Sequence, residues 1–179
     1  MQRTHLTTSM RAIHTAALAL IFGATAAYAG SGARYLALGD SVAFGFSPLT
    51  DYTQSNVRSG EFIGYPESTA DAAGLKVTNA SCPGETTGSF LDASQPDNGC
   101  HSDLNYGAHL KVNYHGAPNQ MAFALRYLAK HRDTTDITIN LGGNDLLLLQ
   151  DECRQSPDFF QCALSRLPGV RANAGANHR

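Results

Sequence analysis

The sequence predicts a single α/β domain built around a parallel sheet. Three short runs rich in apolar or β-branched residues have the length of strands: Tyr35–Leu38, Lys76–Ala80 and Asp136–Leu141. Helical segments lie between them, and an alternation of strand and helix favours parallel pairing with helices on the faces of the sheet. The 179 residues suffice for one such domain and not comfortably for two.

The helices are expected from capping residues and apolar spacing. In the segment Asn119–His131, Met121, Ala122, Leu125 and Leu128 recur at the spacing of one helical face. The segment Phe90–Pro118 shows no clean period and is interpreted as a long loop with short helical pieces. The expected helices are Val42–Phe46, Glu61–Gly74, Asn119–His131, Leu146–Gln150 and Pro157–Leu164.

The first 29 residues have the pattern of a cleaved export signal. Arg3 and Arg11 precede a short apolar run, and Ala27-Tyr28-Ala29 is an A-x-A cleavage site in front of Gly30. The apolar run falls short of the ~20 residues that a membrane span needs. The sequence therefore predicts a signal peptide over residues 1–29, a secreted domain over residues 30–179 and no membrane span in the mature chain.

The charge balance of the mature chain excludes one class of partner. Removing residues 1–29 takes away two arginines and no acidic residue, which leaves 11 basic against 15 acidic side chains. No run of Lys and Arg is present, so nucleic acid is not an expected partner. We expect a monomer.

All four cysteines lie in the mature part: Cys82, Cys100, Cys153 and Cys162. An even number in an exported chain predicts disulfides, for which three connectivities exist. The close spacings favour Cys82–Cys100 and Cys153–Cys162. A zinc site is the alternative, but the chain has no C-x-x-C pair and no histidine at matching spacing.

Each predicted strand is followed by a turn of small and polar residues. Gly39-Asp40-Ser41 follows the first strand, Gly84 lies in the turn after the second, and Gly142-Gly143-Asn144-Asp145 follows the third. In a parallel sheet these turns meet at one edge. A hydroxyl that attacks a carbonyl, a free backbone N–H and an Asn amide together suit a nucleophile with an oxyanion hole. Asp-Ser by itself is also an ordinary helix cap.

These three motifs resemble the first three sequence blocks of the SGNH (GDSL) hydrolases. The resemblance implies a flavodoxin-like three-layer α/β/α fold. It also implies that Ser41 is the nucleophile, and that the N–H groups of Ser41 and Gly84 form the oxyanion hole with the Asn144 amide. Asp40 and Asp145 are expected to brace the turns that carry these groups.

Further residues narrow the resemblance within that family. The stretch from Ser81 to Thr87 and the cysteine placement are similar to the exported, disulfide-bonded esterases and lipases. Val42 stands where the name-giving motif has Leu. The resemblance thus implies cleavage of carboxylic esters, of lipids or acylated sugars, through an acyl-Ser41 intermediate. No metal or organic cofactor is called for.

The chain departs from the family at its other end. The family takes its general base and the acid that orients it from an Asp-x-x-His block, and no histidine of this chain has an aspartate three residues before it. The last two strands of the expected sheet are also missing. We therefore interpret the sequence as the N-terminal part of an SGNH domain, truncated before that block and inactive in this form.

Two other classes of function remain open at this point. One is a secreted, non-catalytic binding module that retains the pocket without a base. The other is a structural secreted α/β domain in which the motifs coincide by chance. The loop histidines His101, His109 and His115 offer a substitute base only if the fold brings one of them to Ser41.

Overall fold

The computed structural model describes residues 32–50, 58–101 and 106–176, and the expected signal peptide lies outside them. The described part contains a three-stranded parallel sheet in the order β2-β1-β3. In this sheet Leu36 of the central strand pairs with Thr78 on one side and Ile137 on the other. The predicted α/β class is therefore confirmed. The strands are β1 (Arg34–Gly39), β2 (Lys76–Asn79) and β3 (Thr134–Asn140).

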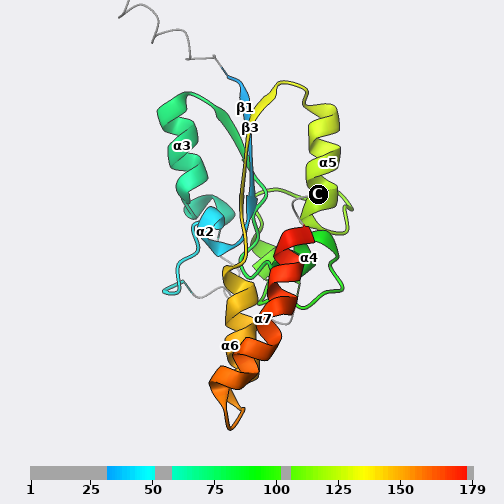
Figure 1. Cartoon of the computed structure of the whole chain (residues 1–179). Helices are drawn as coiled ribbons and strands as arrows, with labels where there is room; N and C mark the ends of the chain where they lie inside the picture. Colours follow the sequence, from blue (N-terminus) through cyan, green and yellow to red (C-terminus); the bar gives the residue numbers. More distant parts are fainter. Residues whose placement is uncertain (1–31, 51–57, 102–105, 177–179) are drawn as a thin grey trace, which may run out of the picture.

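Helices flank the sheet on both sides, as Figure 1 shows with the sheet nearly edge-on. On one side lie α2 (Ser41–Phe44) and α3 (Tyr65–Ala73), and on the other lie α4 (Thr87–Leu91) and α5 (Gln120–Lys130). Beyond the carboxyl end of the sheet, α6 (Gly143–Arg154) and α7 (Phe159–Ala176) pack together as a pair. Short 3₁₀ turns lie at Ser59–Glu61 and Tyr106–His109.

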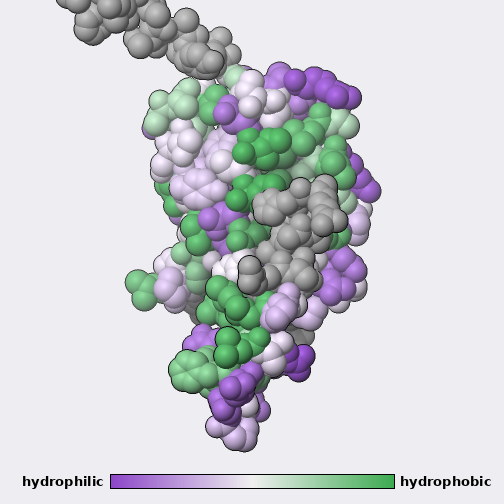
Figure 2. Space-filling view, viewed as in Figure 1, coloured by the Kyte–Doolittle hydropathy of each residue, from purple (hydrophilic) through white to green (hydrophobic). Residues whose placement is uncertain are grey.

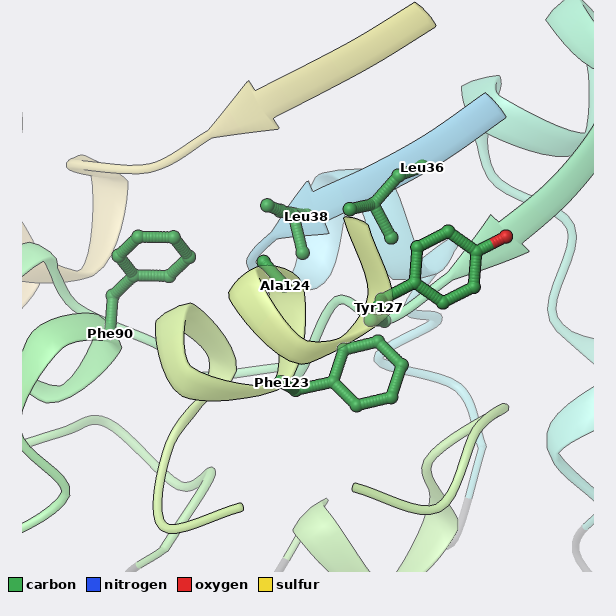
Figure 3. Packing of buried hydrophobic residues seen from close by; sticks show 7 residues of the cluster. Leu36, Leu38, Phe90, Phe123, Ala124 and Tyr127 are labelled. Carbon is green, nitrogen blue, oxygen red and sulfur yellow. The ribbon is translucent and has the colours of Figure 1, made fainter. Parts of the chain in front are cut away.

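The central strand is a continuous apolar run because both of its faces are covered. Leu36 and Leu38 pack with Phe123 and Tyr127 of α5, as seen in Figure 3. The alternate side chains Tyr35 and Ala37 pack on the opposite face, against Ala70 of α3. A parallel strand between two helical layers needs apolar residues at every position, and these four strand residues are at most 2% exposed.

The structure confirms part of the expected apolar stripe of α5 and corrects its centre. Met121 and Leu128 pack against the core, whereas Leu125 is 63% exposed. The buried centre of the face is instead formed by Phe123, Ala124 and Tyr127. Phe123 and Tyr127 lie four residues apart and therefore on the same side of the helix. Gln120 precedes them on that face and is fully buried.

Several element boundaries differ from the predicted ones for local reasons. Helix α3 begins at Tyr65 because Gly64 takes the N-cap position, with Glu67 accepting from its N–H. Helix α4 occupies the start of the predicted loop, since Thr86 caps it. Helix α6 begins at Gly143, three residues earlier than expected, and thereby includes Asn144. Helix α7 also continues well past its predicted end, through Pro168.

Both predicted disulfides are confirmed. Cys82 is bonded to Cys100 at the turn that follows β2, and Cys153 is bonded to Cys162 where α6 meets α7. Each bridge closes a short stretch of chain, of 18 and 9 residues respectively. Within the described residues, no helix combines the length and apolar character required to span a bilayer.

The outer side of β3 is exposed. Ile137 and Ile139 are about half accessible, as are Leu146 and Leu147 of α6. Figure 2 shows hydrophobic surface running down the molecule in this region, in the same view as Figure 1. In the described part of the chain, β3 pairs with β1 alone and forms an edge of the sheet.

Candidate active site

The three turns that carry the candidate residues meet at the carboxyl edge of the sheet. The N–H of Asp40, next to Ser41, donates to the carbonyl of Asn140 at the end of β3, at 3.0 Å. The N–H of Cys82 in the second turn donates to the carbonyl of Gly39 at 2.9 Å. Backbone hydrogen bonds therefore join the first turn to both of the others.

Two glycines allow the turns to approach this closely. Gly39 has φ +134°, and a Cβ there would lie 2.2 Å from the carbonyl oxygen of Asn140. Gly84 has φ +86°, and a Cβ there would lie 2.4 Å from the carbonyl oxygen of Asn98. Any larger residue at either position would meet backbone atoms in a conformation that L-residues avoid. Both positions therefore require glycine.

Ser41 begins α2 directly after its cap. The Asp40 side chain accepts from the Val42 N–H at 3.0 Å, which fixes the first turn of the helix. Among the described residues, neither the hydroxyl nor the N–H of Ser41 forms a hydrogen bond, and the Gly84 N–H donates to none either.

Asn144 lies in the first turn of α6 and is 5% exposed. Its amide nitrogen donates to the carbonyl of Glu85 at 2.9 Å, and its amide oxygen accepts from the Asn98 side chain at 3.1 Å. These two contacts fix the orientation of the amide and occupy one of its two hydrogens. The Asn144 amide is thus hydrogen-bonded to Glu85, the residue that follows Gly84.

Asp145 fastens α6 to the same turn. Its carboxylate accepts from the N–H of Thr87 at 2.9 Å and from the Thr87 hydroxyl at 2.6 Å. Asp40 is also buried, and burial raises the pKa of its carboxyl while the Val42 N–H opposes that shift. Asp40 thus contacts the turn in which it lies, whereas Asp145 contacts the first residue of α4.

Two site residues escaped the sequence analysis, Glu85 and Gln120, and both are fully buried. The Glu85 carboxylate accepts from the Ser89 hydroxyl at 2.5 Å and from the Gln120 amide at 2.8 Å. Burial raises its pKa to about 7, and the donors from Ser89 and Gln120 limit the rise. The sequence signal that could have revealed Gln120 is its position three residues before Phe123, which places a polar side chain on the buried face of α5.

Within the described ranges, no hydrogen bond joins Ser41 to a loop histidine. His101 lies 3.8 Å from the Glu85 carboxylate, and His115 is exposed in a left-handed turn. Hydrogen bonds therefore join the turns that carry Ser41, Gly84 and Asn144, and none among the described residues joins a candidate base to Ser41.

One cluster of potential metal ligands occurs among the described residues. It comprises Cys82, Glu85 and Cys100. Because the two cysteines are bonded to each other, neither offers a thiolate, and this donor set does not suit a metal ion.

The chain was compared with protein-family models, with curated proteins and with solved structures, and no match was found in any of the three.

Proposed function

We propose that this chain carries the nucleophile and oxyanion hole of an exported, SGNH-type serine hydrolase that cleaves carboxylic esters of lipids or acylated sugars. In this proposal Ser41 is the nucleophile. The N–H groups of Ser41 and Gly84 and the Asn144 amide stabilise the oxyanion. Residues 1–29 would direct export and be removed.

One observation supports the proposal: three hydrogen-bond donors follow three separate strands at one edge of the sheet, and the described part of the fold leaves at least one hydrogen of each without a partner. The N–H groups of Ser41 and Gly84 have no partner among the described residues, and the Asn144 amide is immobilised with one hydrogen to spare. Such preorganised donors lower the barrier to acyl transfer, and each is worth about 2.7–4 kcal/mol.

The chemistry would proceed by acyl transfer in two steps. The Ser41 oxygen bonds to the ester carbonyl carbon while its proton passes to a general base, and the carbonyl oxygen becomes an oxyanion held by the three donors. Collapse of this intermediate breaks the bond to the alcohol oxygen, which takes up the proton. Water then attacks the acyl-Ser41 ester by the same route and releases the acid. The described residues place no base beside Ser41.

Covalent labelling tests the proposal directly. The gene product is purified from the medium or periplasm of a host that carries the native coding region, and it is treated with a fluorophosphonate probe. We expect a single label on Ser41, located by peptide mapping. Ser41→Ala should abolish the label, whereas Ser94→Ala, which removes an exposed hydroxyl elsewhere, should leave it intact.

The binding-module alternative gives a different result in the same experiment. A module without catalysis would bind an ester analogue with equal affinity in the wild type and in Ser41→Ala, and it would not be labelled at Ser41. Equal labelling of the wild type and Ser41→Ala would also contradict the proposed hydrolase.

A further inference from the structure

We infer that Gln120 and Glu85 are positioning residues that hold the nucleophile turn and the oxyanion turn in register. This inference rests on the proposed function, since it assigns a role to two buried residues within that site. The two residues lie on different segments of the chain, and neither was assigned a role from the sequence.

Gln120 connects the two turns through both ends of its amide. Its oxygen accepts from the N–H of Gly39, and its nitrogen donates to the carbonyl of Gly39 at 3.0 Å. The amide thus pairs with both backbone groups of the residue that ends β1, as a neighbouring strand would. The same nitrogen donates to the Glu85 carboxylate at 2.8 Å. The Gln120 side chain therefore binds both Gly39, two residues before Ser41, and Glu85, directly after Gly84.

Glu85 extends this connection to the third donor. Its backbone carbonyl accepts from the Asn144 amide, so its position determines where that amide lies. Its carboxylate is anchored by Ser89 of α4 as well as by Gln120. Gly84 thus directly precedes Glu85, and the Asn144 amide is one hydrogen bond away from it. Ser41 lies two residues after Gly39, which Gln120 binds.

Burial makes the pair difficult to replace. Both side chains are fully buried, and a buried polar group that loses its partner keeps its desolvation penalty. The charged or titratable groups that face Glu85 are Asp40, Asp97, His101 and Tyr114. A carboxylate at position 120 would add a second negative charge within hydrogen-bond distance of Glu85.

The test separates positioning from folding by measuring the rate of Ser41 phosphonylation. The native gene product is treated with a p-nitrophenyl phosphonate, and p-nitrophenolate release yields the maximal rate kinact and the affinity KI. We expect Gln120→Glu to lower kinact about 10- to 100-fold with KI within threefold, because a displacement near 1 Å of a reacting or stabilising group costs about that much. The double variant Glu85→Gln/Gln120→Glu restores an amide–carboxylate pair and should recover at least half of that loss on a logarithmic scale.

Gln120→Met is a second variant. Methionine has a similar shape, but it lacks the hydrogen bonds of Gln120 and the negative charge of the Glu variant. It should lower kinact about tenfold. All rates are taken well below the melting temperature of each variant, so that the folded fraction is equal. If both Gln120 variants retain kinact within twofold of the wild type, the inference is wrong while the proposed function stands. If the wild type is not phosphonylated at Ser41, the proposed function itself fails.

Discussion

Ser41 and Asn144 contribute unequally to the proposed reaction. Ser41 supplies the atom that forms the new bond, whereas Asn144 supplies only one of several hydrogen bonds to the oxyanion. In a form of the protein that has a general base, Ser41→Ala should reduce kcat by about 10⁶-fold, the loss typical of a missing triad nucleophile. Asn144→Ala should reduce it by roughly 10²–10³-fold. Turnover of p-nitrophenyl acetate measures both. A Ser41→Ala variant that keeps more than a tenth of the activity would contradict the assignment.

Glu85 should make the stability of the fold depend on pH. Its pKa is raised from 4.5 to about 7 by burial, so between these values the folded protein holds a proton that the unfolded chain has released. The free energy of unfolding should therefore fall as the pH rises from about 4.5 to 7. The shift corresponds to about 3 kcal/mol at full ionisation.

Glu85→Gln tests this dependence because the amide has the same shape and does not titrate. We expect the variant to lose less stability than the wild type between pH 4.5 and 7, as measured by urea denaturation at fixed ionic strength. Asp136→Asn, a change at an exposed carboxylate on β3, is the matched control and should leave the pH dependence unchanged. Parallel curves for the wild type and Glu85→Gln would mean that folding does not raise the pKa of Glu85.

At the scale of elements, the two disulfides differ in what they support. Cys82–Cys100 closes the segment that contains Gly84, whereas Cys153–Cys162 joins α6 to α7 away from the oxyanion turn. Replacing either pair by alanines should cost ~3 kcal/mol for loops of these sizes. Only the loss of Cys82–Cys100 should also slow Ser41 phosphonylation.

The disulfide variants are therefore controls for each other. Thermal melts measure the stability of both variants. The rate of Ser41 phosphonylation, taken 15 °C below each melting point, shows whether the active site is intact. Loss of the Cys153–Cys162 bridge can slow labelling as much as loss of Cys82–Cys100 does only if Cys82–Cys100 has no particular role in holding the Gly84 turn.

At the scale of the whole molecule, the open edge at β3 is the main weakness of the described fold. Ile137 and Ile139 are exposed beside unpaired backbone groups, which is a template for association. Residues 30–179 expressed alone in an oxidising compartment should therefore aggregate and should not turn over p-nitrophenyl acetate efficiently. A soluble, Ser41-dependent esterase with a cooperative melt would contradict this expectation.

A charged substitution on β3 tests whether the exposed edge of this strand causes the expected aggregation. Ile139→Lys should increase the soluble fraction of residues 30–179 severalfold, measured by size-exclusion chromatography, because a lysine on an edge strand opposes strand pairing. Leu125→Lys changes an equally exposed apolar residue on α5 and should have little effect. An equal gain from Leu125→Lys would point to general hydrophobicity rather than to the strand edge.

Local sequence features determined much of the framework. The continuous apolar run of β1, the Asp40 cap, the three glycine-containing turns and the order of strands and helices could all be predicted. Each depends on residues close together in the chain, through capping, turn geometry or the period of a strand. The disulfide pairing was also predictable, since both bridges join cysteines that are near in sequence.

Tertiary contacts alone decided the rest. Gln120 meets Gly39 across 81 residues and Glu85 across 35, and no local pattern specifies such partners. The buried face of α5 was likewise set by the space beneath β1 and β2, which Phe123 and Tyr127 fill while Leu125 remains outside. A residue becomes part of a core or a site through what the fold places opposite it, and that is a property of distant segments brought together.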